Sequence, residues 1–236
     1  MSPPRLDLSR VRAVTLDLDD TLWPVWPTIE RAEHALRDWL TPRAPGAARL
    51  AADSHVQRRV REAVLLEQPH IAHDLGAIRR EKIRQLLREA GEDETLAEPA
   101  YDAFYAARQQ VDLYPDALAT LEALSARYPV VALSNGNADV HHVGIGRFFH
   151  DALHPAKVGF SKPDARIFHA GAAAAGVAPD AVLHIGDDAQ LDAAGALAAG
   201  MQTIWINRTD ARWPAGFAQA PHAEVPSLTA LRTLLG

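Results

Sequence analysis

The fold is decided by "AVTLDLDDTLW", residues 13–23, in which a short apolar run leads directly into three acidic side chains. The run is typical of a buried β-strand. Asp17, Asp19 and Asp20 follow within four positions, where their like charges repel one another. Acids crowded at the end of an apolar strand require a compensating partner, so this stretch predicts a functional site as well as a strand.

Further apolar runs predict the rest of a sheet. Each is rich in Val, Ile or Leu and stops at Asp, Asn or Gly, as parallel strands covered on both faces do. The four predicted strands are Val11–Leu18, Pro129–Asn135, Ala181–Asp188 and Gln202–Asn207, with a weaker fifth around Ala152–His154. Helical stretches separate them from residue 113 onward, one of which is expected to begin at Pro163. This alternation predicts an α/β domain with a parallel sheet.

Residues 24–112 have a different pattern. Stretches such as "TIERAEHALRDWL", "AARLAADSHVQRRVREAVLLEQ" (residues 47–68) and "LGAIRREKIRQLLREAG" carry helical periodicity with no strand between them. We therefore expect residues 1–23 and 113–236 to form the α/β core, and residues 24–112 to form an all-helical insertion.

Composition narrows the function. The net charge of -6 argues against a nucleic-acid partner, and the absence of cysteine excludes disulfides and thiolate sites. The apolar stretches are too short to span a membrane, and the first ten residues lack the apolar segment of a signal peptide. We expect a cytoplasmic protein, and an anionic small substrate remains compatible with the net charge because a pocket can be locally positive. A monomer or a homodimer is the expected assembly.

The predicted strand ends bring acidic residues together. Asp187 and Asp188 end the third of the four main strands, and Asp192 follows a turn later. The carboxyl ends of parallel strands meet at one edge of the sheet, where ligands bind, so these acids should meet Asp17 and its neighbours. Mg²⁺ is the expected compensating cation, because it prefers oxygen ligands and is held by carboxylates together with a substrate phosphate.

A phosphate group explains two further residues. Lys162, in "GFSKPD", supplies an ammonium that can balance phosphate charge, and the Ser134 hydroxyl can hold a phosphate oxygen. Lys157 is a weaker candidate for the same role. Asp17 can then attack phosphorus to form an aspartyl-phosphate, while Asp19 protonates the leaving alcohol.

These motifs occur in the order seen in the haloacid dehalogenase superfamily, and the chain resembles that family over nearly its whole length. The motifs are "DLDDT", the Ser-Asn-Gly that begins at residue 134, the "SKPD" lysine and "GDDAQLD". The resemblance implies a Rossmann-like three-layer α/β/α core with a parallel sheet, and a small all-α cap domain inserted after the first motif.

The resemblance also implies roles for individual residues. Asp17 would be nucleophile and metal ligand, Asp19 the general acid/base with its carbonyl on the metal, and Asp187 a further metal ligand. Phosphate or substrate would be bound by Asp17, Thr21, Ser134, Asn135 and Lys162. Asp188 and Asp192 would support the site from behind, and Asp188 is also the expected cap of the following helix.

An acid at position 19 matters within the superfamily, because dehalogenating members lack one there. The chain therefore looks like a Mg²⁺-dependent phosphatase of small phosphate monoesters. Several segments, including "LDLDDTLW", "SNGNA" and "GMQTIWINR", are similar to bacterial phosphatases of flavin mononucleotide and of the ribitylaminouracil phosphate of riboflavin synthesis. A phosphomutase and a non-catalytic module that accepts phosphate on Asp17 remain alternatives.

Two tryptophans stand where the chain leaves the acidic loop for the insertion. Trp23 and Trp26 are suited either to stack on a flat ring of the substrate or to pack the hinge, and hinge packing is the favoured interpretation.

Overall fold

A computed structural model of the chain describes residues 5–217 and 219–236. The chain divides into two compact units: Met1–Pro24 with Asp112–Gly236, and Val25–Val111. Within the described residues, no helix is both long and apolar enough to cross a membrane.

The first unit is built on a six-stranded sheet in which every strand pair is parallel. The strand order is β3-β2-β1-β4-β5-β6. The strands are β1 Ala13–Leu16, β2 Val130–Leu133, β3 Asp151–Leu153, β4 Val182–Gly186, β5 Gln202–Ile206 and β6 Ala223–Val225. The predicted α/β class with a parallel sheet is confirmed.

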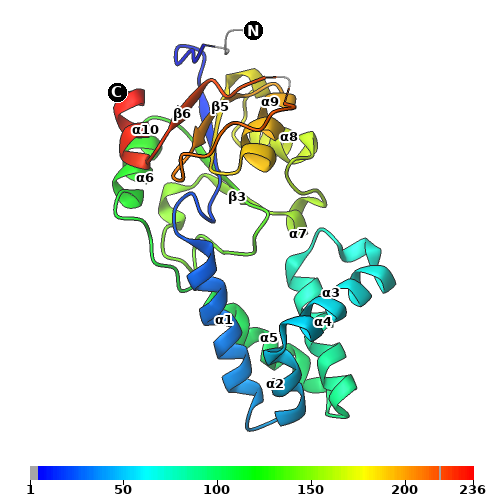
Figure 1. The fold of residues 1–236 in the computed structure, drawn as a ribbon. Coiled ribbons are helices and arrows are strands. Elements are labelled where there is room, and N and C mark those ends of the chain that lie inside the picture. The colour runs from blue at the N-terminus through cyan, green and yellow to red at the C-terminus, as the bar shows by residue number, and fades with distance from the viewer. Residues whose placement is uncertain (1–4, 218) are drawn as a thin grey trace. The chain divides into compact units, whose positions relative to one another are not determined.

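Helices cover both faces of this sheet, with α6 and α10 on one face and α8 and α9 on the other (Figure 1). Their bounds are α6 Ala117–Ser125, α7 Pro155–Val158, α8 Ala165–Ala174, α9 Gly195–Ala198 and α10 Leu228–Leu235. A π-helical segment, η5 Ala189–Ala194, precedes α9, and short 3-10 turns occupy Gly146–Phe148 and Pro179–Ala181. Burial of strand side chains from both faces accounts for the continuous apolar runs in the sequence.

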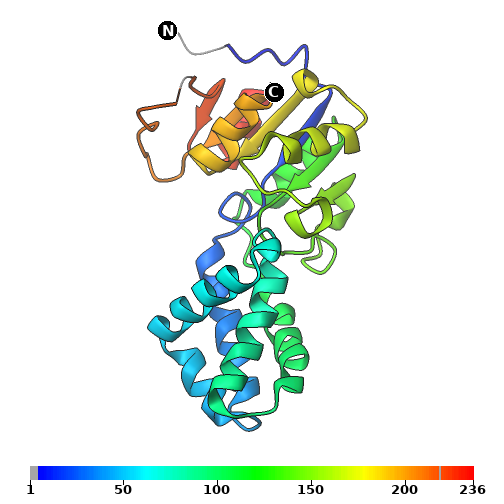
Figure 2. The ribbon, with the colours of Figure 1, turned by 90° about the vertical axis from the view of Figure 1, so that its right-hand side faces the viewer.

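The second unit consists entirely of helices, which Figure 2 shows packed side by side. They are α1 Val25–Leu40, α2 Pro45–Ala52, α3 Ser54–Glu67, α4 Leu75–Ala90 and α5 Ala97–Arg108, with 3-10 turns at Pro69–Ile71 and Glu94–Leu96. Their buried faces share one apolar cluster that includes Leu36, Leu86 and Phe104. The expected helical insertion between β1 and β2 is therefore present.

Three details differ from the sequence-based expectation. The strand β6 was not predicted, because it has only three residues and a single buried position. The stretch expected as one helix across residues 47–68 is broken at Asp53, whose carboxylate accepts from the backbone of His55 and Val56 and so begins α3. Helix α8 begins after Asp164, which caps it, and not at Pro163.

Register places the acidic segments side by side. β1 pairs with β4 so that Leu16 lies opposite Ile185, and the backbone N–H of Asp17 donates to the Ile185 carbonyl at 2.9 Å. Asp17 and Asp187 therefore leave neighbouring strands at the same edge of the sheet, which is the edge where parallel α/β sheets bind ligands.

Candidate active site

Three carboxylates form the centre of the site. One oxygen from each of Asp17, Asp187 and Asp192 lies within 4.8 Å of the others. Asp17 and Asp192 are buried, at 5% and 1% exposure. Asp192, which the sequence suggested as a supporting residue, lies in this cluster beside Asp17 and Asp187.

Lys162 is the cation of this cluster. Its ammonium lies 2.5 Å from Asp192 Oδ1 and also pairs with Asp17 Oδ1, and the lysine is only 4% exposed. Burial would lower the pKa of Lys162, but Asp17 and Asp192 together raise it above its usual value. The amine is therefore held in its charged form between two acids.

The pKa values of the three carboxylates are shifted in different directions. Burial raises the pKa of Asp17 well above its usual range, and Lys162 offsets that effect only in part. Burial, followed by repulsion from Asp192, raises the pKa of Asp187 to about 7. Burial would also raise the pKa of Asp192, but Lys162 and His184 lower it below its usual value.

These charges do not balance. Three carboxylates and one ammonium give a formal charge of -3 + 1 = -2 when all are ionised. The donors are all oxygen atoms, which suit a hard divalent cation. The residues present therefore fit a divalent metal such as Mg²⁺, which would remove the excess charge.

Thr21 links two of the predicted metal ligands, Asp17 and Asp187. Its hydroxyl lies 3.1 Å from Asp17 Oδ2 and 2.9 Å from Asp187 Oδ1, so its single proton serves one carboxylate at a time. Thr21 is fully buried. The structure thus places Thr21 between the acids, whereas the resemblance had assigned it to the substrate.

Asn135 is engaged with the lysine segment. Its side-chain amide donates to the Lys162 carbonyl at 2.9 Å and accepts from the Lys162 backbone N–H at 2.7 Å. Ser134, beside it, is 3% exposed and accepts from the Gly136 backbone at 2.9 Å. Both residues border the site, but the amide of Asn135 is already used to hold the segment that carries Lys162.

Asp19 is oriented by a neighbouring indole. Asp19 lies three residues beyond the end of strand β1 at Leu16. The chain turns at Asp20, with φ of 60°, and Trp23 Nε1 donates to Asp19 Oδ1 at 2.8 Å. Trp23 is fully buried whereas Trp26 is 71% exposed, so the two tryptophans that the sequence grouped together have different environments.

The remaining predicted acid, Asp188, caps the next helical segment. Its Oδ1 accepts from the backbone of Gln190 and Leu191 at 2.8 and 2.7 Å, as expected. That segment is the π-helix η5, which carries Asp192. The Asp192 carboxyl packs against Gly186 so closely that a Cβ at position 186 would overlap it.

These groups line a pocket of about 160 Å³. Its lining includes all of the predicted site residues except Thr21, namely Asp17, Asp19, Ser134, Asn135, Lys162, Asp187, Asp188 and Asp192. A charged pocket at the strand ends, with a carboxylate, an ammonium and a hydroxyl in reach, can bind and attack a phosphoryl group.

Sequence reasoning missed two residues that brace the acidic loops. Trp205 Nε1 donates to the Asp187 carbonyl at 2.6 Å, and Arg208 Nη2 donates to the Thr21 carbonyl at 3.0 Å. Both residues belong to "TIWINR" at the end of β5. An indole and a guanidinium beside a strand end could have indicated their bracing role.

Known proteins resemble this chain in sequence over most of its length. A family model described as haloacid dehalogenase-like hydrolase matches residues 11–200. The chain is 33% identical over 236 residues to 5-amino-6-(5-phospho-D-ribitylamino)uracil phosphatase YigB of Escherichia coli K12, covering 97% of this chain and 98% of that protein.

Solved structures also resemble this chain. A 2-haloacid dehalogenase from Pseudomonas syringae pv. Tomato DC3000 has a TM-score of 0.89 and 36% identity, over 95% of this chain and 98% of that one. The HAD-hydrolase YfnB from Bacillus subtilis, bound to magnesium, has a TM-score of 0.67 and 19% identity, over 96% and 99% of the two chains, and shares the fold.

Proposed function

The chain belongs to the haloacid dehalogenase-like hydrolases, and from that premise we propose that it is a Mg²⁺-dependent phosphatase of small phosphate monoesters. The observation that carries the proposal is the cluster of Asp17, Asp187 and Asp192 around the buried Lys162, beside the Ser134 hydroxyl. In this proposal residues 1–23 and 113–236 are the catalytic core, and residues 24–112 are a helical cap domain.

Asp17 and Asp187 would hold the metal, together with the backbone carbonyl of Asp19. Bound there, Mg²⁺ supplies positive charge that neutralises the carboxylates and the phosphate oxygens. Burial raises the pKa of both Asp17 and Asp187, and a cation bound between them would favour their ionised forms.

Asp17 is the proposed nucleophile. A carboxylate oxygen attacks phosphorus, the bond from phosphorus to the ester oxygen breaks, and an aspartyl-phosphate forms. Lys162 and Ser134 bind the phosphate oxygens, where an ammonium and a hydroxyl stabilise the charge that develops. Asp192 positions Lys162 by pairing with its ammonium. Asn135 positions it by hydrogen bonding to the Lys162 backbone.

Asp19 is the proposed general acid and base. It gives a proton to the departing alkoxide, and then removes one from the water that attacks the aspartyl-phosphate. That second attack breaks the bond between Asp17 and phosphorus and releases inorganic phosphate. The hydrogen bond from Trp23 fixes the Asp19 carboxylate in one orientation and supports a positioning role for this buried indole.

Similarity to a haloacid dehalogenase makes dehalogenation the second candidate. That reaction displaces halide, which needs no proton, so it has no use for an acid at position 19. The presence of Asp19 and of an acid cluster suited to a divalent cation favours the phosphatase.

For the substrate, we propose an ester related to riboflavin synthesis, either ribitylaminouracil phosphate or flavin mononucleotide. Identity of 33% to the E. coli phosphatase across almost the full length of both chains supports it. The similar segments noted above lie on both sides of the helical insertion.

The test is phosphate release from a panel of flavin mononucleotide, ribitylaminouracil phosphate, sugar phosphates and nucleotides, with 2-chloropropionate as the dehalogenase substrate. We expect Mg²⁺-dependent release that EDTA stops, and no halide. An isomerised sugar phosphate without free phosphate would establish a mutase, and a long-lived phosphorylated chain without turnover would establish a phospho-accepting module.

Variants make the test specific. Asp19→Asn should lower kcat by about 100- to 10,000-fold, and the aspartyl-phosphate should accumulate. The matched control is Asp180→Asn, which removes an exposed acid whose partner is the surface residue Arg10. Wild-type turnover by Asp19→Asn would refute its assigned role.

A further inference from the structure

Strand β4 carries a histidine in its buried interior. The strand reads "VLHIG" over Val182–Gly186, and all five residues are buried, with His184 only 1% exposed. An imidazole removed from water needs hydrogen-bond partners for its ring nitrogens. None of the roles proposed above belongs to His184, so its partners decide whether it serves the site or only the core.

Both ring nitrogens of His184 have a partner. Nδ1 lies 2.9 Å from the Thr15 hydroxyl, because the register of β1 against β4 sets Thr15 opposite His184. Nε2 lies 3.3 Å from Asp192 Oδ1. Phe168 packs edge-on against the ring, with the two centroids 5.1 Å apart and the planes at 89°. The ring is therefore confined to one orientation, with one nitrogen toward the hydroxyl and the other toward the acid.

These partners decide which nitrogen donates. An ionised carboxylate only accepts hydrogen bonds, whereas a hydroxyl can donate or accept. Asp192 is ionised beside the Lys162 ammonium, so Nε2 of His184 must carry the proton between the two side chains. The Thr15 hydroxyl completes the arrangement, because it can donate to Nδ1 and leave the proton on Nε2.

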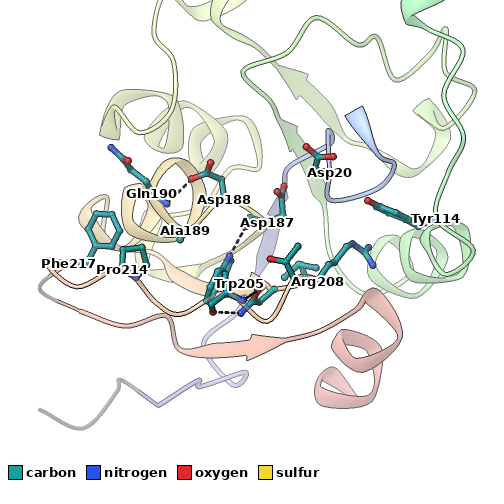
Figure 3. A pocket seen from close by; sticks show the side chains of 14 residues that line it. Asp20, Tyr114, Asp187, Asp188, Ala189, Gln190, Trp205, Arg208, Pro214 and Phe217 are labelled. Atoms are coloured by element: carbon teal, nitrogen blue, oxygen red, sulfur yellow. Dashed lines mark hydrogen bonds between the residues drawn. The ribbon is translucent and has the colours of Figure 1, made fainter. Parts of the chain in front are cut away.

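The bond from His184 acts on the carboxyl oxygen that also holds the lysine. Asp192 Oδ1 lies 2.5 Å from the Lys162 ammonium, and Oδ2 accepts from the Asp188 backbone N–H at 3.0 Å. Figure 3 shows the Asp188 side chain bonded in turn to Gln190, at the start of the segment that carries Asp192. The backbone bond restrains one oxygen of Asp192, and His184 restrains the other.

This restraint reaches the reacting carboxylate through the lysine. The Lys162 ammonium pairs with Asp17 as well as with Asp192, and all three residues are buried. A change in the position of Asp192 Oδ1 therefore moves the ammonium relative to Asp17. Misplacing a reacting group by about 1 Å can cost about 100-fold in rate.

We propose that His184 is a positioning residue for phosphoryl transfer, whose Nε2–H orients the Asp192 carboxylate. That carboxylate in turn holds the Lys162 ammonium beside Asp17, where the lysine is to bind phosphate. The proposal rests on the phosphatase function above and adds a residue that acts through another. His184 itself touches neither substrate nor metal in this role and transfers no proton.

The test uses two variants of similar size. In His184→Gln the side-chain amide can donate from about the place of Nε2, whereas His184→Met has a similar length and no donor. With p-nitrophenyl phosphate and Mg²⁺, His184→Met should lower kcat/KM by about 10- to 100-fold, as loss of a supporting hydrogen bond does at metal sites. His184→Gln should keep at least about one fifth of the wild-type kcat/KM, because it keeps the hydrogen bond. His169→Met is the control and should leave kcat/KM unchanged, because His169 is an exposed residue of α8 whose ring contacts the Ala199 carbonyl.

The order of the two variants separates positioning from packing. If His184 only filled the core, methionine would be tolerated better than glutamine, because an apolar site penalises a buried amide. Activity of His184→Met equal to or above that of His184→Gln, at equal folded fraction by circular dichroism, would therefore overturn the proposal. Failure of the phosphatase function itself would show differently, as no phosphate release by the unaltered chain.

A measurement on the unaltered chain needs no variant to fold. In ¹⁵N-labelled protein, NMR should find a proton on Nε2 of His184, and this proton should exchange slowly with solvent because the residue is 1% exposed. An Nε2 atom without a proton, or a proton that exchanges as fast as those of exposed histidines, would overturn the proposal whatever the turnover.

Discussion

Replacing Lys82 by methionine should stabilise the protein. Lys82 lies on α4 and is 8% exposed. Burial, followed by repulsion from Arg79 and Arg61, lowers its pKa from 10.5 to about 8, and Glu33 offsets this only in part. Methionine has a similar length, no charge and a good fit to apolar interiors.

The size of the effect follows from the pKa shift. A difference of 10.5 - 8 = 2.5 units, at about 1.36 kcal/mol each, corresponds to about 3 kcal/mol of destabilisation when both states carry the charge. Below pH 8 both states do. Between pH 8 and 10.5 the unfolded state still binds the proton that the folded state has released, so the cost shrinks as pH rises, and above 10.5 it vanishes.

The assay is urea unfolding of both proteins at pH 7 and at pH 10, followed by far-UV circular dichroism. Lys82→Met should raise the free energy of unfolding by about 3 kcal/mol at pH 7, and by clearly less at pH 10. Lys157→Met is the control, because Lys157 is exposed and its ion pair with Asp151 is worth about 1 kcal/mol or less. A variant that is less stable at pH 7, or whose advantage is the same at both pH values, would refute the reasoning.

Other predictions concern the acid cluster. Asp17→Asn should reduce phosphate release by at least about 1,000-fold with an unchanged circular dichroism spectrum, since it removes the proposed nucleophile; wild-type rates would exclude the covalent route. Asp192→Asn leaves Lys162 with one acid, and should lower the free energy of unfolding in urea by about 3 kcal/mol. In EDTA, protonation of Asp187 favours the folded state, so its contribution is present at low pH and lost as pH rises toward about 7. The melting temperature of the metal-free chain should therefore fall between pH 5 and 8 relative to Asp187→Asn, and a parallel pair of curves would contradict this.

The sequence predicted well those features that are encoded locally. The apolar runs and the acids that follow them lie within a few residues of each other, so the parallel sheet and the meeting of Asp17 with Asp187 could be predicted from strand ends alone. Lys162 was predicted as the site's cation because it is a lysine in the loop "GFSKPD". The structure places its ammonium between Asp17 and Asp192.

The features that were missed depend on contacts between distant segments. The role of Asn135 arises from two hydrogen bonds to a segment 27 residues away. Arg208 reaches a carbonyl 187 residues earlier in the chain. The burial of Lys82 depends on how α4 packs in the helical unit, and nothing in its own sequence neighbourhood distinguishes it from an exposed helix lysine.

The close packing of Gly186 against Asp192 limits how this enzyme can evolve. Any larger side chain at position 186 collides with the carboxyl that holds the lysine, so the first substitution there is harmful while Asp192 remains. Shortening residue 192 to glycine would remove the three atoms nearest to a Cβ at position 186, although the lysine would then lose a partner. The two positions are therefore epistatic, and the order in which mutations arise decides which sequences descendants of this chain can reach.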